Sequence, residues 1–178
     1  GIGQGYIQTT PIQLCLMTAQ IANGGYKIYP KIIVDDQETK QPSDKFTPLY
    51  QDSKNIKIIQ DAMFGSTNEV MGTSYRSSID DLRYQFAGKT GTAQVKRITE
   101  RDRELDLKTF EIPYEERDHA LYIAFGPYKN PRYALSVLVE HGGNGSTTAA
   151  PMAKKLFKLI IDRHSLRESI NNKKYLEI

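Results

Sequence analysis

The sequence lacks the features that would tie it to a membrane, to a disulfide framework or to nucleic acid. It contains no run of 18 apolar residues, so none of its 178 residues is expected to lie in a membrane span. Cys15 is the only cysteine, which excludes an intrachain disulfide but leaves the redox compartment open. The 24 basic and 21 acidic residues leave a net charge of +3, too small to indicate nucleic acid binding. The first residue is Gly1 rather than methionine, and we interpret the chain as a processed or excised segment.

Patterns for metal, cofactor and serine–histidine chemistry are also missing. No G-x-S-x-G motif occurs near the stretch "GGNGSTT", so a serine–histidine–aspartate hydrolase has no support. The stretch "HGGNGS" is interpreted as a glycine-rich turn, with an anion-binding nest of backbone amides as the alternative. The adjacent acids at 35–36 and 80–81 are expected to be solvated. We predict no metal and no cofactor; three histidines lack metal-ligand spacing and are interpreted as structural, namely His119, His141 and His164.

What the sequence does contain begins with a well-marked helix, "TTPIQLCLMTAQIANGG". Thr10 is a suitable N-cap, Pro11 occupies the first helical position, and Gly24 or Gly25 supplies a left-handed exit. The residues between these signals leave almost no polar face. The segment is therefore predicted to be a buried helix, with Cys15 as a small core residue.

The next segments predict a strand, a loop and a second helix. Residues 26–34 form a β-prone run that Pro30 restricts to an edge or a bulge. A polar stretch, "DDQETKQPSDK", is predicted to be a loop. Residues 54–71 are predicted to form a helix with one apolar face, made by Ile56, Ile59 and Met63.

Three β-prone runs then predict an antiparallel sheet: "YQFAGKTGTAQV", "HALYIAFGPY" and "YALSVLVEH". The short turn "KNPR" makes the last two a hairpin. The highly charged segment 96–118 is interpreted as a solvated loop, with an arm at the mouth of a site as the alternative. A closing helix is predicted to lay its apolar stripe on the sheet, and the polar tail after His164 is expected to fray. The stripe consists of Met152, Ala153, Leu156 and Ile160.

The stretch "QFAGKTGTAQV" at 85–95 has two interpretations. As a phosphate-binding loop it would need a glycine at position 83, which is Arg83, and a helix start where a β-prone run follows. That interpretation fails on both points. As a strand it could grip a carboxylate, because Lys89 supplies a cation and Thr90 and Thr92 supply stiff hydroxyl donors.

The glycine in this strand is compatible with the binding of an extended peptide. Gly91 would let a ligand lie against the backbone and extend the sheet by one strand. Alternation places Lys89 and Gly91 on one face and Thr90 and Thr92 on the other, unless the ligand runs along the edge. K-T-G alone is a short match, and a glycine-containing strand with surface polar residues remains the alternative.

Three stretches of the sequence resemble segments of a known protein family. "GKTGTAQ" resembles the third motif, K-S/T-G, of penicillin-recognising serine transpeptidases. "GIGQGYIQTTPIQLCLMTAQIANGG" and "RDHALYIAFGPYKNPRYALSVLVEHGGNGSTTAAPMAKKLF" resemble the segments before and after that motif in class B penicillin-binding proteins, most closely the penicillin-binding protein 2 group. The resemblance covers nearly residues 1–162. It implies an α/β fold with an antiparallel sheet of at least three strands and flanking helices, an incomplete transpeptidase or β-lactamase-like fold.

The resemblance also implies a domain organisation and residue roles. Residues 1–162 would be the C-terminal portion of a transpeptidase domain, with 96–118 a charged loop and 163–178 a polar tail. Lys89 would orient the carboxylate of substrate or penicillin, and Thr90 and Thr92 would hydrogen-bond it. The backbone N–H of Thr92 would form half of an oxyanion hole. The substrate-binding stretch would comprise Lys89, Thr90, Gly91, Thr92, Ala93 and Gln94.

The implied reaction is acyl transfer in cell-wall synthesis. A serine attacks a D-Ala-D-Ala peptide bond, and an amine from a neighbouring stem peptide resolves the acyl-enzyme, while a β-lactam mimics the donor and stays attached. The family's nucleophile lies in S-x-x-K, and no serine of this chain has lysine three residues later. The second motif, S-x-N, occurs only after the glycine-rich opening segment rather than before it, and we interpret these matches as chance: Ser53-Lys54-Asn55, Ser66-Thr67-Asn68 and Ser169-Ile170-Asn171.

The chain is therefore expected to be inactive alone and to need the remainder of its own domain. An unpaired sheet edge and an apolar helix face are expected to drive homodimerisation of the isolated chain. The resemblance places the parent protein in the cytoplasmic membrane, with this domain in the periplasm. Two alternatives stay open: a β-lactamase-like hydrolase or β-lactam sensor, and a non-catalytic module that binds extended peptides.

Overall fold

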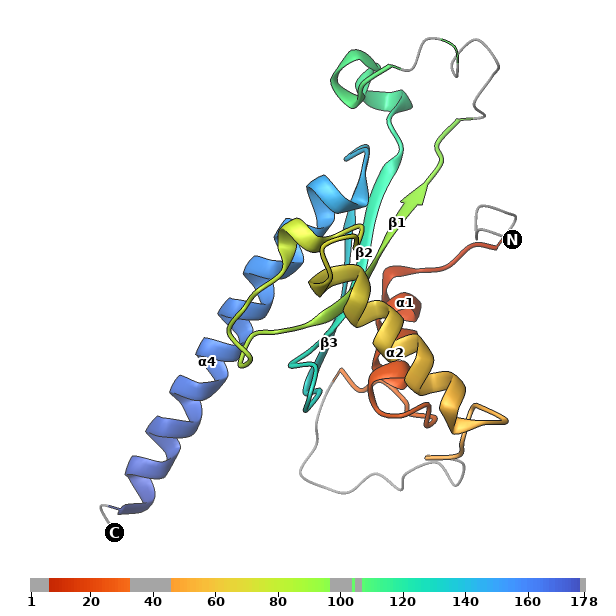
Figure 1. Ribbon diagram of the computed structural model, residues 1–178. Helices are drawn as coiled ribbons and strands as arrows, with labels where there is room; N and C mark the ends of the chain where they lie inside the picture. Colours follow the sequence, from red (N-terminus) through yellow and green to blue (C-terminus); the bar gives the residue numbers. More distant parts are fainter. Residues whose placement is uncertain (1–6, 33–45, 97–103, 105–106, 177–178) are drawn as a thin grey trace.

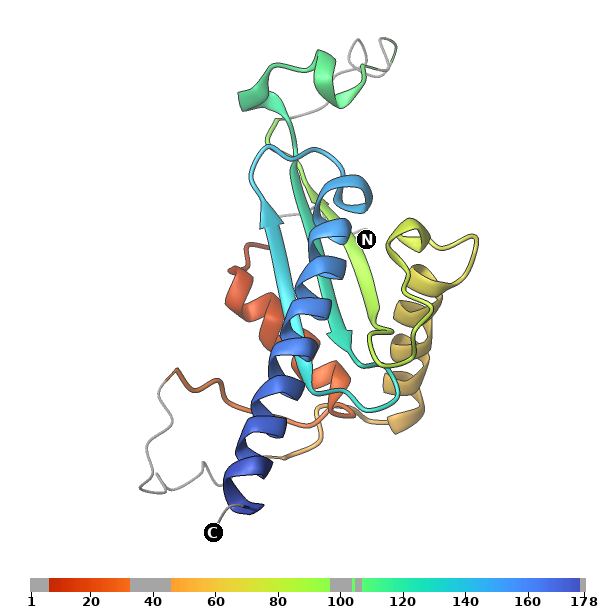
Figure 2. The same ribbon diagram turned by 90° about the vertical axis from the view of Figure 1, so that its left-hand side faces the viewer.

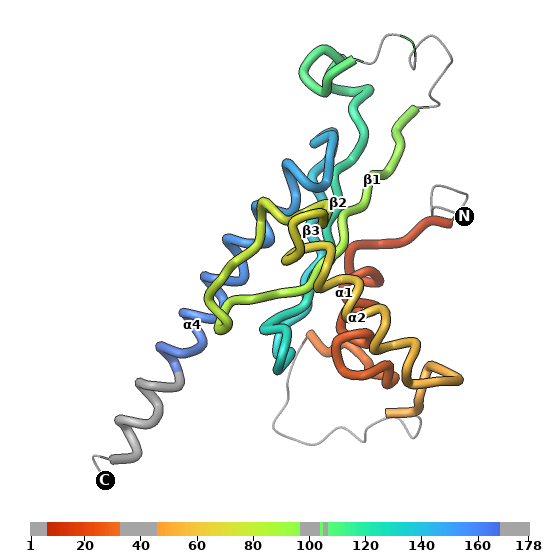
Figure 3. Tube along the Cα trace, in the orientation of Figure 1, coloured from red at the N-terminus to blue at the C-terminus, as the bar shows by residue number. Residues whose placement is uncertain are grey.

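A three-stranded antiparallel sheet forms the centre of the molecule, and helices cover both of its faces (Figures 1 and 2). The structure is a computed structural model that describes residues 7–32, 46–96, 104 and 107–176 (Figure 1), and Figure 3 traces the chain in the same orientation. The strands are β1 (Ala87–Ala93), β2 (His119–Gly126) and β3 (Tyr133–Val139), in the order β1-β2-β3. The three predicted strands and the β2–β3 hairpin are thus confirmed, and so is the predicted fold class.

The register of the strands decides which side chains share a face. Thr90 of β1 lies opposite Tyr122 of β2, and Lys89 lies opposite Ile123. Opposed residues of an antiparallel pair project to the same side of a sheet. Tyr122 packs in a core with Phe157 of α4 (Ala150–Leu176), whereas Ile123 packs on the side of α1 (Pro11–Ala22) and α2 (Ser53–Asn68). β1 therefore carries Thr90 on its α4 face and Lys89 on its α1 and α2 face.

The predicted start and exit of α1 are confirmed. Thr10 and Gln13 form a capping box, in which the Gln13 N–H donates to Thr10 Oγ1 at 3.3 Å and the Thr10 N–H donates to Gln13 Oε1 at 2.8 Å. Pro11 is the first helical residue. Gly24 and Gly25 have φ angles of +94° and +86°, which only glycine adopts readily.

The predicted burial of α1 is wrong for most of its surface. Thr18 is its one fully buried residue, while Ile12 is 61% and Met17 is 42% exposed. The reason is that α1 contacts β3, β2 and α2 on its inner side, and no other described element covers its outer side. Cys15 is half-buried against β3, with its Sγ 3.5 Å from the Ala134 carbonyl.

α2 follows the predicted helix closely but ends earlier, at Asn68. The Asn68 side chain donates to the carbonyls of Phe64 and Phe86, at 3.0 and 2.9 Å, and so joins the end of the helix to the start of β1. Of the predicted apolar face, Met63 is buried, Ile56 is half-buried and Ile59 is 42% exposed.

The strand predicted at 26–34 is not formed in its described part. Tyr26 makes an isolated bridge with Pro48, and residues 27–32 continue without regular structure. Backbone hydrogen bonds flank this bridge, from the Lys27 N–H to the Thr47 carbonyl at 2.9 Å and from the Phe46 N–H to the Lys27 carbonyl at 2.8 Å. Farther along, Pro30 has no N–H with which to continue a ladder. Residues 33–34 and the predicted loop at 35–45 lie outside the described residues.

α4 packs on the sheet with a face that matches the predicted stripe at Ala153 but not at Met152 or Leu156. Met152 and Leu156 are 45% and 40% exposed, whereas Ala153 and Phe157 are fully buried. Phe157 stacks on Phe86 with ring centroids 4.9 Å apart. Small alanines let the helix approach the sheet closely, which explains why this face is preferred. The helix also continues to Leu176, so the expected frayed tail is helical.

The described part of the charged segment projects beyond the end of the sheet (Figure 1). It contains two short 3₁₀ turns, η2 (Thr109–Glu111) and η3 (Tyr114–Glu116), and Lys96 forms an ion pair with Glu116 at 2.6 Å. Residues 97–103 and 105–106 lie outside the described residues, and the role of this arm stays a prediction. A helix of the length and hydropathy needed to cross a membrane does not occur among the residues that are described.

Candidate functional site

β1 carries the K-T-G-T stretch along one edge of the sheet. Its inner edge pairs with β2, and no described strand pairs with its outer edge. An extended peptide could therefore be added at this edge through main-chain hydrogen bonds. All six predicted site residues lie on β1 or directly after it, namely Lys89, Thr90, Gly91, Thr92, Ala93 and Gln94.

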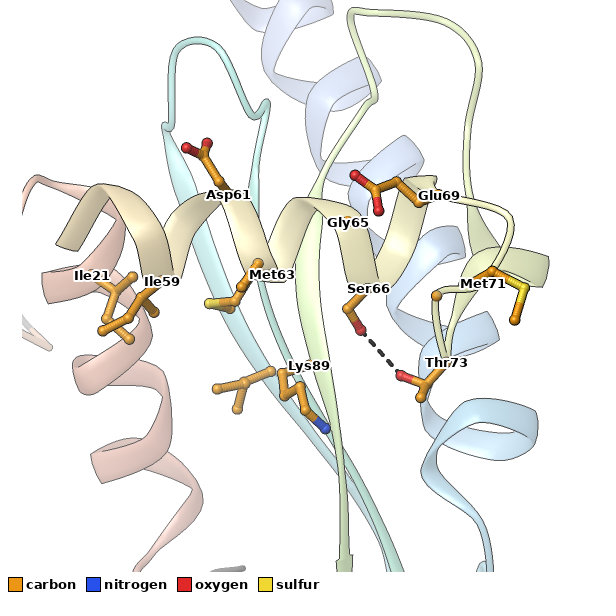
Figure 4. A pocket seen from close by; sticks show the side chains of 13 residues that line it. Ile21, Ile59, Asp61, Met63, Gly65, Ser66, Glu69, Met71, Thr73 and Lys89 are labelled. Carbon is orange, nitrogen blue, oxygen red and sulfur yellow. Dashed lines mark hydrogen bonds between the residues drawn. The ribbon is translucent and has the colours of Figure 1, made fainter. Parts of the chain in front are cut away.

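Lys89 lies beside a hollow of about 670 Å³ between α1, α2 and the sheet (Figure 4). The side chains of Ile21, Met63 and Ile123 make much of its lining apolar. The Lys89 ammonium donates to the Thr90 carbonyl at 2.9 Å and to Thr90 Oγ1 at 3.2 Å. The contact with Oγ1 shows that both side chains reach the outer edge of β1, although they start on opposite faces.

The carboxylates that line this hollow point away from Lys89. Figure 4 shows Asp61 and Glu69 on the far side of α2, with Lys89 beneath the helix. Asp61 is bound to Lys57, at 2.7 Å, and to the Tyr128 hydroxyl. These contacts hold the pKa of the Asp61 carboxyl below its usual range. Neutral oxygens, rather than a described carboxylate, are therefore the partners that the structure gives the Lys89 ammonium, which suits it to an incoming anion.

A chain of hydroxyl groups links the end of α2 to Thr90. Ser66 Oγ lies 3.1 Å from Thr73 Oγ1 (Figure 4). Thr73 Oγ1 in turn lies 3.5 Å from Thr90 Oγ1. Gly72 makes this approach possible, because a Cβ there would sit 2.4 Å from the Ser66 carbonyl oxygen. Neither Ser66 nor Thr73 is among the predicted site residues: Ser66 occurs in an S-x-N match interpreted as chance, and Thr73 was not singled out. The hydroxyl-rich run "GTS" at 72–74, between α2 and β1, is the signal that points to Thr73.

A second group of hydroxyls, fully buried, supports β1 from the α4 face. Tyr122 Oη lies 2.9 Å from Thr67 Oγ1 and 3.0 Å from Ser74 Oγ, and Ser74 also donates to the Ser66 carbonyl at 2.9 Å. Burial raises the pKa of the Tyr122 hydroxyl, which therefore stays protonated. The group fixes α2 and the following turn relative to β2, and hence relative to Thr90.

The glycine-rich turn after β3 packs directly on the middle of β1. A Cβ on Gly145 would lie 2.7 Å from the Gly91 carbonyl oxygen and 2.4 Å from the Leu121 carbonyl oxygen. The turn is held at its start by the His141 N–H, which donates to His119 Nδ1 at 2.9 Å. The two histidine rings also contact each other, with centroids 4.8 Å apart. Both histidines thus hold the turn beside the site.

The comparisons with known proteins agree with this geometry. Residues 1–158 match the model of the family described as penicillin binding protein transpeptidase domain, so the chain belongs to this family. It is 33% identical to the peptidoglycan D,D-transpeptidase MrdA of Salmonella typhimurium, over 91% of this chain and 26% of that protein. It thus spans about a quarter of the length of the curated relatives it matches.

Solved structures give the same assignment. PBP2 of Pseudomonas aeruginosa, in complex with WCK 5153, is 34% identical with a TM-score of 0.70, over 89% of this chain and 32% of that one. PBP2 of Helicobacter pylori, in complex with MreC, is 32% identical with a TM-score of 0.70, over 90% of this chain and 26% of that one. The expected likeness to the penicillin-binding protein 2 group is confirmed.

Proposed function

We propose that this chain forms the carboxylate-binding wall of a peptidoglycan D,D-transpeptidase that acts through a serine acyl-enzyme. The observation that carries the proposal is the pairing of Lys89 Nζ with Thr90 Oγ1, 3.2 Å apart, at the outer edge of β1. A carboxylate placed there would accept from an ammonium and a hydroxyl together, while the peptide backbone adds to the strand. The same carboxylate position would be used by a β-lactam.

The proposal assigns the remaining steps to positions on and beside β1. The N–H of Thr92 would stabilise the developing oxyanion, as half of the oxyanion hole. The nucleophilic serine and its lysine would come from the rest of the domain, because this chain contains no S-x-x-K. The apolar hollow beside Lys89 gives that remainder a surface against which to pack. The chain alone would then be inactive.

The proposal extends to location and partners. The parent protein would be held in the cytoplasmic membrane, with this domain in the periplasm, where stem peptides and β-lactams are found. D-Ala-D-Ala stem peptides would be donors and an amine of a second stem peptide the acceptor. Homodimerisation of the isolated chain stays a prediction.

Intact-mass measurement after incubation with penicillin tests the proposal. The full-length protein that contains this chain should gain one stoichiometric adduct, and residues 1–178 alone should gain none. Lys89→Ala in the full-length protein should slow acylation about 10- to 100-fold, the loss of one charge-assisted hydrogen bond. Lys155→Ala, which removes an exposed lysine of α4, is the matched control and should leave the rate unchanged.

The outcome separates the alternatives. An adduct on residues 1–178 would contradict the claim that the nucleophile lies elsewhere. Rapid loss of the adduct to water, rather than to an added amine, would indicate a hydrolase. Peptide binding with no adduct on the full-length protein would indicate a non-catalytic module.

A further inference from the structure

A second hollow, of about 470 Å³, lies on the other side of Thr73 from the one beside Lys89. It is lined by the turn that follows α2, by the glycine-rich turn after β3 and by the start of α4. We call it the Arg76 hollow. Its polar lining consists of Thr73, Tyr75, Arg76, Ser77, Ser146 and Thr147.

The Arg76 hollow adjoins the strand at the point where a donor carboxylate would be held. Thr73 lines both hollows, and its hydroxyl is the one that contacts Thr90. On the opposite wall, Ser146 follows Gly145, whose backbone packs directly on the Gly91 carbonyl. Thr90 and Thr92 lie on the α4 face of β1, and the hollow opens on the same face. A ligand that binds the Thr90 hydroxyl on the α4 face therefore lies next to the Arg76 hollow.

Arg76 is the charged residue in this lining, and its charge is not balanced within the described structure. It makes no hydrogen bond, ion pair or ring contact with a described residue, and it is exposed. Asp81, a nearby acid in sequence, is paired instead with Arg83 at 2.6 Å, and Glu69 folds back against Gly65. A guanidinium beside hydroxyl groups in a concave site is suited to bidentate binding of a carboxylate.

We propose that the Arg76 hollow receives the acceptor peptide and that Arg76 binds a carboxylate on it. This inference rests on the proposed transpeptidase function. The terminal D-alanine of the donor departs from the Thr90 side, so the acceptor must approach the acyl carbon through the space it vacates. The acceptor nitrogen forms the new amide bond, the serine oxygen leaves, and the proton lost by the amine returns to that oxygen. The rest of the acceptor then extends into the adjoining hollow.

A competition between two acceptors tests this inference in the full-length protein. The two are the same amine-bearing peptide, once with a free carboxylate and once with that group as a carboxamide, supplied together with one D-Ala-D-Ala donor. The wild-type protein should favour the carboxylate acceptor in the ratio of products. Arg76→Gln should lower that preference about tenfold, as expected for one charge-assisted pair. Arg76→Lys should restore part of it, because the charge returns without the bidentate geometry.

Controls separate this inference from the proposed function. Arg163→Gln removes the same charge from an exposed position of α4 and should keep the wild-type ratio. A wild-type ratio in both Arg76 variants, with the penicillin adduct still forming, would overturn the inference and leave the transpeptidase function intact. Failure of the wild-type protein to form the adduct would overturn both. If Arg76→Gln fails to fold, Arg76→Lys decides alone: a reduced preference supports the inference and an unchanged one overturns it.

Discussion

Gly88→Ala is expected to damage the site without touching any predicted ligand contact. Gly88 lies directly before Lys89 on β1 and faces the buried ring of Tyr122. An ideal Cβ on Gly88 would sit 2.4 Å from Tyr122 Oη, 2.5 Å from Cζ and 2.6 Å from Cε1. The ring would have to move by about 1 Å to restore ordinary contact distances.

The surroundings of Tyr122 resist such a movement. The ring is fully buried against Phe86, and its hydroxyl is bonded to Thr67 and Ser74. Forcing an extra carbon into a packed core costs about 1–3 kcal/mol, and each hydroxyl bond that is lost adds about 1 kcal/mol. We expect a total of roughly 2–4 kcal/mol. The same movement displaces the turn that carries Thr73, so the contact with Thr90 should loosen as well.

The measurement compares two glycine substitutions in the full-length protein, by urea unfolding and by the rate of penicillin acylation. Gly65→Ala is the matched control, because its Cβ meets only the flexible end of Glu69, at 3.1 Å, within helix α2. Alanine is favoured over glycine inside a helix by about 1 kcal/mol, so this variant should be neutral or more stable. If Gly88→Ala matched Gly65→Ala in both stability and acylation rate, the assigned packing of Tyr122 against β1 would be wrong.

Two further outcomes follow from single residues. Tyr122→Phe should be less stable than the wild type at pH 8, and the difference should shrink above pH 10. The reason is that the raised pKa of Tyr122 keeps the folded hydroxyl protonated while the unfolded one ionises, so its contribution is present below pH 10 and is lost as pH rises through the folded pKa. Urea unfolding at pH 8, 10 and 11 measures this, and a constant difference would contradict it. Thr10→Ala should lower stability by about 1 kcal/mol by removing the cap of α1, with Thr9→Ala as an exposed control that leaves stability unchanged.

The local signals in the sequence were sufficient for the strands and for the ends of α1. The alternation in β1 placed Lys89 and Thr90 on opposite faces, and the register with β2 confirms it. Thr10 and Pro11 fixed the start of α1 because capping depends on neighbours within one turn. Such features need no knowledge of distant parts of the chain.

The failures came where the outcome depends on which surface is nearby. Residues 150, 153 and 157 share one face of α4, and residues 152, 156 and 159 share another. Either spacing suits a helix face, but the alanine-rich face is the one that packs on the sheet. Hydrophobicity alone predicted a buried α1, yet described elements cover only the side that faces β3, β2 and α2. The β-prone run at 26–34 had propensity, but among the described residues its pairing ends at Lys27, which bonds to Phe46 and Thr47. In each case tertiary contacts outweighed local preference.

The candidate site also combines features that local sequence predicts with features that depend on distant contacts. Lys89 and Thr90 could be found from a motif because they are adjacent on one strand, whereas Thr73 and Arg76 approach β1 only through the position of the turn after α2. That position depends on Asn68, which bonds the Phe86 carbonyl at 2.9 Å, and on Tyr122, which lies more than 50 residues from the helix it holds. A substitution at Tyr122 or Gly88 should therefore alter carboxylate binding at Thr90 more than its own distance from a ligand suggests, because the hydroxyl chain through Thr73 transmits the displacement.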